Sequence, residues 1–177
     1  MLERGNGGSV DQDEDYSTYV SGRWAALVRF AVLLGCSRHE AEDVAQTTLV
    51  RCYVSWDKVV RASDRDAYVY RMLLNAHATS RRRRWWQEQP TGQLPDQPVE
   101  DDSVATELAD SVQRALARLS KQQRRVVVLR YFADLSERQT AEVLGVPTGT
   151  VKSRLSRAIA AMADDPDLAD VPGWSIR

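Results

Sequence analysis

The chain has 177 residues, of which 43% are hydrophobic and 28% are charged, so it is long enough for one medium-sized or two small globular domains. No apolar run approaches the roughly 18 residues that a membrane-spanning helix needs, and the polar, acidic start has no signal-peptide core, so we expect a cytoplasmic protein without a membrane partner. The formal net charge of -1 hides a strong segregation of charge along the sequence.

Two basic blocks, residues 16–90 and 105–163, alternate with acidic segments at both ends and between them. The spacer QPTGQLPDQPVEDDS holds three prolines and several carboxylates and has no helical period, which is typical of a linker, placed at residues 90–104. Basic blocks on either side of an acidic linker indicate two domains that bind polyanions. The alternative, that these charges only keep helix surfaces hydrated, stays open at this point.

An acidic, disordered N-terminus is expected over residues 1–14, and a first helical domain over residues 15–89. The first helix covers residues 15–34, where apolar side chains recur three or four positions apart. A capping-box pattern that begins at Ser37 opens the second helix, whose apolar stripe extends to Trp56.

A third helix is predicted to start at Ser63 or Asp64 and to end in the basic run SRRRRWWQ. The second domain is predicted over residues 105–163, beginning with helices at 105–119 and 121–132. The stretch VVVLRYF would form the buried part of the second of these helices. An acidic tail, residues 164–177, is expected to be a disordered end. Since the sequence has few alternating stretches, the fold class is all-α with two small helical domains.

The stretch SERQTAEVLGVPTGTVKSRLSRAIA has helix-turn-helix spacing. A second capping box starts at Ser136, and the small Ala141 allows another helix to pack closely. Gly145 supplies a left-handed turn, and Val151 falls where a buried β-branched residue is expected. The second helix would then expose hydroxyls and cations, the groups that bind phosphates and base edges in a major groove. The helix-turn-helix spacing and the exposed hydroxyls and cations together predict that this domain binds DNA.

No catalytic or metal-binding motif is present in the sequence. Cys36, His39 and Cys52 are the conceivable zinc ligands, but their spacing matches no common zinc motif. Neither a glycine-rich phosphate loop nor a nucleophile elbow occurs. We therefore expect no enzymatic activity, no cofactor and no metal, and no disulfide between the two cysteines.

Three segments together resemble the sigma-70 family of RNA polymerase sigma factors, in its short extracytoplasmic-function (ECF) group and near its actinobacterial SigE-like members. AEDVAQTTLVRCYVSW is similar to region 2.2 of the family, and DAYVYRMLLNAHATSRRRR is similar to regions 2.3 to 2.4. The segment from LARLSKQQRR to the end of the second basic block resembles region 4, and its GTVKSR is close to the family's most recognisable hexapeptide. The resemblance implies a dissociable polymerase subunit that directs core enzyme to promoters.

By this resemblance, the second domain reads the -35 element as duplex DNA. The residues that match the family's contact face are Thr148, Gly149, Thr150, Lys152, Ser153, Ser156 and Arg157. The first domain engages and helps to open the -10 element, where a turn at Arg61 to Asp66 captures a flipped base. The implied -10 residues are Arg61, Ser63, Asp64, Tyr68, Arg71, Asn75, Arg81, Arg82, Arg83 and Arg84.

The resemblance also implies the partners. Asp43 and Gln46 match the face that binds the clamp helices of the largest polymerase subunit, and the second domain would meet the flap of the second-largest. The acidic linker, with Asp96, Glu100, Asp101 and Asp102, would enter the RNA exit path and mimic RNA charge. An anti-sigma protein is a further candidate partner. Two alternatives stay open: a stand-alone helix-turn-helix regulator, and a recombinase with a similar DNA-binding tail, for which a catalytic set is missing.

Overall fold

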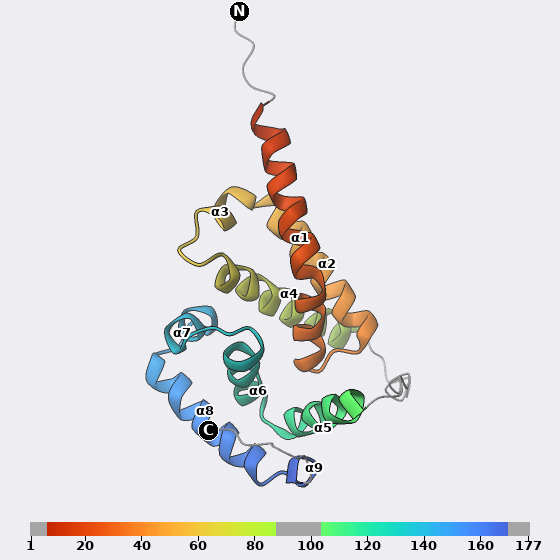
Figure 1. The fold of residues 1–177 in the computed structure, drawn as a ribbon, viewed down its shortest axis with the longest axis vertical. Helices are drawn as coiled ribbons and strands as arrows, with labels where there is room; N and C mark the ends of the chain where they lie inside the picture. Colours follow the sequence, from red (N-terminus) through yellow and green to blue (C-terminus); the bar gives the residue numbers. More distant parts are fainter. Residues whose placement is uncertain (1–6, 88–103, 170–177) are drawn as a thin grey trace, which may run out of the picture. The chain divides into compact units, whose positions relative to one another are not determined.

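The computed structural model describes residues 7–87 and 104–169, and every regular element in these two ranges is helical (Figure 1). The chain divides into two compact units, residues 1–31 with 38–89 and residues 32–37 with 90–177. The predicted all-α fold with two helical domains is confirmed. Within the described ranges, no helix combines the length and the apolar character that crossing a bilayer requires.

The first unit is built on four helices, α1 (Gly7–Leu33), α2 (Arg38–Val54), α3 (Trp56–Val60) and α4 (Arg65–Gln87). Its core forms because each helix places apolar residues three or four positions apart on one side. Phe30 of α1 packs on Tyr70 of α4 with ring centroids 4.6 Å apart. Leu73 of α4 is fully buried, and α2 packs against α4.

Two features of the first unit differ from the expectation. Helix α1 begins at Gly7, so residues 7–14, expected to be disordered, are helical. Asp13 Oδ1 accepts a hydrogen bond of 2.9 Å from the Tyr53 hydroxyl, which ties this acidic turn to α2. The second helix ends at Val54 because Ser55 leaves the helical region, at φ -116° and ψ 25°, and Trp56 starts the separate helix α3.

The second unit contains α5 (Val104–Arg118), α6 (Lys121–Val127), a π-helical turn η1 (Val128–Phe132), α7 (Glu137–Leu144), α8 (Thr148–Ala163) and α9 (Pro166–Ala169). Capping boxes open α6 and α7: Ser120 with Gln123, and Ser136 with Gln139, exchange side-chain and backbone hydrogen bonds. The box at Ser136 confirms the prediction from the sequence.

The predicted helix over residues 121–132 widens into a π-helical turn at its end. The N–H of Ala133 donates to the carbonyl of Val128, five residues earlier, at 3.1 Å. Val128 and Leu129 are buried, but Tyr131 and Phe132 are about half exposed. The expectation that VVVLRYF is buried throughout is therefore wrong at its aromatic end, because the wider turn rotates these rings outward.

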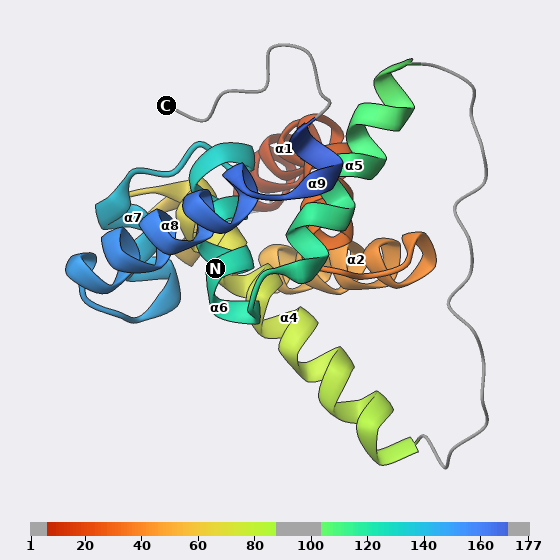
Figure 2. The same ribbon diagram turned by 90° about the horizontal axis from the view of Figure 1, so that it is seen from below.

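The expected disordered tail is corrected for residues 164–169. Asp165 is buried and its Oδ1 lies 2.7 Å from Arg118 Nη1, while Asp167 Oδ2 lies 2.6 Å from the same nitrogen. Leu168 is only 2% exposed. These contacts hold α9 against α5, as both views show (Figures 1 and 2), so the second unit extends beyond residue 163.

Candidate nucleic-acid interface

The turn between α7 and α8 has the predicted glycine geometry. Gly145 ends α7 in the left-handed region, at φ 65° and ψ 39°. The N–H of Val146 donates to the carbonyl of Ala141 at 3.1 Å, and Pro147 occupies the position before α8 in extended conformation. Only glycine adopts this conformation without strain, so the sequence places the turn at a single residue.

A small core lies beneath this turn and sets the angle between the two helices. Val126, Ala141 and Val151 form one buried cluster, and Val126 and Val151 are fully buried. The partly buried residues packed around the cluster are Leu144, Val146 and Leu155. The small Ala141 lets α7 approach α8, as the spacing predicted, and the helix-turn-helix arrangement is confirmed.

The opposite side of α8 presents polar groups to solvent. The exposed residues there are Thr148, Gly149, Lys152, Ser153, Ser156 and Arg157. Thr150 is half-buried, and its carbonyl accepts a hydrogen bond of 3.1 Å from the Ser153 hydroxyl. Lys152 Nζ lies 3.6 Å from Glu137 Oε2 on α7, a weak exposed ion pair that a stronger anion can displace.

The first turn of α8 is open to an anion. Thr150 and Val151 are the first residues whose N–H groups donate within the helix, both to the carbonyl of Pro147. The N–H groups before them have no intrahelical acceptor, and the helix dipole adds positive potential at this end. A methyl group built on Gly149 would meet no atom within 4 Å, so the approach to the backbone there is unobstructed. This geometry suits a phosphate oxygen.

In the first unit, the turn from Arg61 to Asp66 joins α3 to α4, and its last two residues, Arg65 and Asp66, already belong to α4. Arg61 and Ser63 are exposed, whereas Asp64 is half-buried. Asp64 Oδ1 accepts a hydrogen bond of 2.8 Å from the N–H of Ala67, so this carboxylate caps α4 and marks the predicted helix start. One oxygen of Asp64 is therefore used to cap the helix. The exposed side chains of Arg61 and Ser63 are accessible to a ligand.

A stripe of polar residues follows α4 from this turn. Tyr68, Arg71, Asn75 and Arg82 are spaced three, four and seven positions apart, which places them on one helix face. Tyr68 is half-buried and the other three are exposed. Arg81 flanks the stripe and is also exposed. The side chain of Arg84 and the tryptophan pair after it lie outside the described side chains, as do the four acidic residues of the linker.

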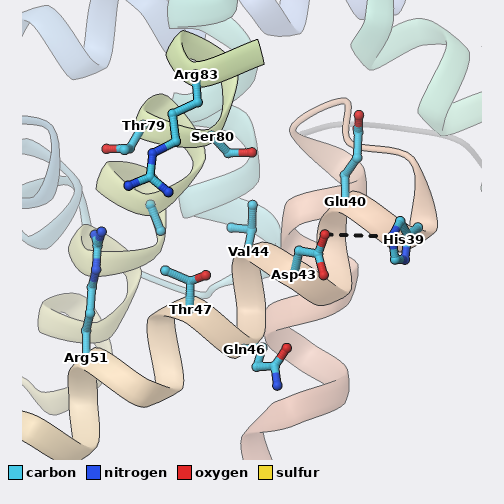
Figure 3. Close-up of a pocket in the computed structure, with 11 residues that line it drawn as sticks. His39, Glu40, Asp43, Val44, Gln46, Thr47, Arg51, Thr79, Ser80 and Arg83 are labelled. Carbon is cyan, nitrogen blue, oxygen red and sulfur yellow. Dashed lines mark ion pairs between the residues drawn. The ribbon is translucent and has the colours of Figure 1, made fainter. Parts of the chain in front are cut away.

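Asp43 and Gln46 line a groove of about 560 Å³ between α2 and α4 (Figure 3). His39 Nε2 lies 3.8 Å from Asp43 Oδ2 at one end of it. At the other end, Arg51 and Arg83 extend toward one another from the two helices (Figure 3). Arg83 therefore lines this groove and does not lie on the Tyr68 stripe, although both were expected to serve the -10 element. The groove is acidic at one end and basic at the other.

The conceivable zinc ligands do not come together. Among the described residues, no three histidine, cysteine or carboxylate side chains gather in a way that could hold a metal ion. Both cysteines are buried and neither forms a disulfide, and Cys52 Sγ lies 3.8 Å from the sulfur of Met72. Burial raises the pKa of the Cys52 thiol to about 11, which disfavours the thiolate that a metal needs.

Sequence reasoning missed a network at the Arg61–Asp66 turn, formed by Tyr19, Arg23, Arg65, Asp66 and Asp15. Arg23 and Asp66 form an ion pair between α1 and α4. The signal available was the spacing of Tyr19 and Arg23, one turn apart on the first predicted helix. That spacing indicates a shared face but not the partner, which lies more than 40 residues away in sequence.

Comparison with known proteins supports both units. The family model described as sigma-70, region 4, matches residues 109–162. The RNA polymerase sigma-E factor of Streptomyces avermitilis is 37% identical over 157 residues, covering 89% of this chain and 88% of that protein. The ECF RNA polymerase sigma factor SigM of Mycobacterium tuberculosis is 35% identical, covering 77% of this chain and 69% of that protein.

A solved structure extends the likeness to the fold. The sigma factor RpoE of Bartonella quintana, crystallised with the anti-sigma factor NepR, superposes with a TM-score of 0.71 at 27% identity. That likeness covers 84% of this chain and 94% of the other. This coverage is much larger than residues 109–162, so the similarity is not confined to the helix-turn-helix.

Proposed function

The chain belongs to the ECF group of the sigma-70 family of RNA polymerase sigma factors, and on that premise we propose how its two units divide the work of promoter-specific initiation. As a sigma factor it directs transcription initiation, with its region 4 as a DNA-binding module. The observation that carries the proposal is the polar face of α8, which is open to solvent. None of the exposed residues on this face belongs to the core beneath the helix-turn-helix.

The second unit is proposed to read the -35 duplex through α8. The first turn, Thr148 to Thr150, would receive a backbone phosphate on its open N–H groups. Lys152, about one helix turn further along, and Arg157, about two turns further along, would reach base edges, where lysine and arginine hydrogen-bond to guanine. Ser153 and Ser156 are short donors on the same face and would hold the helix in register on phosphate or base edges.

The first unit is proposed to engage the -10 element as a partly opened strand. Arg61 and Ser63 of the turn would meet a flipped base, and Asn75 would hydrogen-bond to base edges. Tyr68 would stack on a base and Arg71 would hold the strand backbone, which is how single-stranded DNA is commonly bound. Arg81 and Arg82 would extend the phosphate contacts along α4.

The groove at Asp43 and Gln46 is proposed to receive the clamp helices of the largest polymerase subunit. A carboxylate and an amide at its acidic end suit basic side chains of a helical partner. The second unit would contact the flap of the second-largest subunit. An anti-sigma factor is proposed as a regulator, as in the Bartonella complex. The polymerase would perform all the chemistry, and this chain would supply recognition without enzymatic activity.

Transcription in vitro tests the proposal. Core polymerase from Streptomyces would be incubated with sheared genomic DNA, with and without the protein, and the transcript starts would be sequenced. We expect new, sharply defined starts that share two upstream elements. Unchanged start sites, or a protein that never associates with core enzyme, would overturn the proposal. A stand-alone regulator would instead bind promoter duplex tightly in the absence of polymerase, which a mobility-shift assay measures.

A further inference from the structure

The last two residues of the Arg61–Asp66 turn, Arg65 and Asp66, are the first residues of α4, and they tie this turn to α1. Arg65 Nη1 lies 3.8 Å from Asp15 Oδ1, and the guanidinium of Arg23 pairs with Asp66 Oδ2. The second oxygen of Asp66 accepts a hydrogen bond of 3.4 Å from the Tyr19 hydroxyl. Both oxygens of Asp66 are thus held by α1, from residues one helical turn apart.

Aromatic rings fill the space around these charges. The guanidinium carbon of Arg65 lies 5.3 Å from the ring centroid of Trp56 and 5.8 Å from that of Tyr19. The two rings are 5.4 Å apart, and Trp56 Nε1 donates to Asp15 Oδ2 at 3.2 Å. Burial and the nearby Asp66 carboxylate raise the pKa of the Tyr19 hydroxyl, which therefore remains a donor. Cations that lie over aromatic rings and also pair with carboxylates are held in one arrangement.

The other end of the turn is anchored separately. Trp56 and Val59 of α3 are buried, and the N–H of Arg61 donates to the carbonyl of Asp57 at 3.2 Å. The turn is therefore fixed on both sides, while the side chains of Arg61 and Ser63 between the anchors stay exposed. The residues that hold the turn and the residues that can meet a ligand are different sets.

We propose that Tyr19, Arg23 and Asp66, supported by the Arg65–Asp15 pair, are positioning residues that hold the Arg61–Asp66 turn in the shape needed to capture a flipped -10 base. This rests on the proposed function of the first unit. A turn that is already ordered loses less conformational entropy when a base enters it, so its contacts discriminate between bases more strongly.

The charges give the proposal a specific consequence. Arg23 and Arg65 lie beside the Arg61–Asp66 turn, where Asp66 and Asp15 offset their charges. Arg23 forms the close pair, so we expect it to act by holding the turn and not as a phosphate ligand. Removing Arg23 should weaken base discrimination and leave the salt dependence of binding unchanged, whereas removing a true phosphate contact such as Arg71 should lower the salt slope by about 0.7 to 0.9.

The experiment uses holoenzyme assembled from the full chain and core polymerase, on a promoter first mapped with the wild-type protein. The probes are forked DNAs in which each base in turn occupies each unpaired -10 position. Affinity is measured for every probe at several salt concentrations. The variants are Arg23→Met, Tyr19→Phe and Asp66→Asn, with Arg23→Lys as the conservative replacement. Arg38→Met is the matched control, because it breaks an exposed pair with Glu42, on α2 of the same unit.

Arg23→Met is expected to reduce discrimination at one -10 position by about fivefold to tenfold, part of what one base contact supplies. Arg23→Lys should restore much of it, and Arg38→Met should behave as wild type. Arg23→Met and Asp66→Asn break the same ion pair. The double variant should therefore lose no more base discrimination than either single variant.

Two results would overturn the proposal while leaving the sigma function intact. One is wild-type discrimination in Arg23→Met. The other is a salt slope that falls by a full contact, which would make Arg23 a phosphate ligand. If Arg23→Met does not assemble with core enzyme, Tyr19→Phe, which removes one hydroxyl, decides the matter by the same two measurements. A wild-type protein that supports no specific initiation would refute the proposed function itself.

Discussion

Arg118 Nη1 of α5 lies 2.7 Å from Asp165 Oδ1, although the two residues are 47 positions apart in sequence. The same Asp165 oxygen accepts a hydrogen bond of 3.0 Å from the N–H of Asp167, so it joins α5 to the start of α9. Asp165 is 6% exposed, and a carboxylate so buried needs its cation. This pair closes the second unit at the end opposite the helix-turn-helix turn.

The ion pairs of Arg118 with Asp165 and Asp167 predict that the stability of the second unit depends on pH. The hydrogen bond from Arg118 holds the pKa of the Asp167 carboxyl below its ordinary value of 3.8. Because the folded-state pKa is depressed, the stabilisation is fully present above the ordinary value and is lost as the pH falls through the folded-state pKa. Scanning calorimetry of the full chain should show a melting temperature that falls below about pH 4. Asp167→Asn should flatten this decline. Glu142→Gln, in an exposed pair on α7, should leave it as in wild type.

Gly145→Ala should destabilise the second unit by about 1 to 2 kcal/mol, because a residue with a β-carbon is strained in the left-handed conformation. A methyl group at Gly145 would meet no atom within 4 Å, so the loss would come from the backbone alone. Gly22→Ala is the matched control: it lies within α1 with equal space, and should stabilise the chain by about 0.5 to 1 kcal/mol. Urea unfolding of both variants measures the difference, and two stabilised variants would contradict the assigned turn.

Val151→Ala should lower the free energy of unfolding by about 2 to 3 kcal/mol, because it removes two buried methyl groups from the cluster between α7 and α8. Val54→Ala removes the same atoms from a side chain that is 80% exposed, and should change stability by less than about 0.5 kcal/mol. Equal effects in denaturant unfolding would mean that Val151 is not part of the core.

Arg157→Ala should weaken binding to the -35 element by about 1 to 3 kcal/mol and relax the preference at one base pair, if the side chain reads a base edge. Lys121→Ala, an exposed cation at the start of α6, is the control for a general loss of charge. Competition of holoenzyme between promoters that differ at single -35 positions measures the preference. An unchanged preference with reduced affinity would reassign Arg157 to the phosphate backbone.

The helix-turn-helix could be predicted from the sequence because its signals are local. Ser136 and Gln139 cap each other within one turn, and Gly145 alone satisfies the left-handed geometry. The spacing from Ala141 to Val151 then requires one shared core. Each of these features depends on residues within one helical hairpin, so periodicity and capping rules suffice to find them.

The features that sequence reasoning missed depend on distant partners. Asp13 in the first part of α1 is bonded to Tyr53 of α2, and Asp167 of α9 is paired with Arg118 of α5. An acidic segment read alone is typical of a solvated tail, because nothing local identifies the cation that will neutralise it. The break at Ser55 likewise follows from the burial of Trp56 and Val59, which pulls α3 out of line with α2.

The outward residues of α8 take no part in the core under the turn, and this separation has an evolutionary consequence. Substitutions at Lys152, Ser156 or Arg157 change exposed side chains alone, so they leave the folding of the hairpin nearly untouched. If α8 reads the -35 element as proposed, gene duplicates of such a chain could acquire new sets of target genes through a few surface changes, without first passing through unstable intermediates.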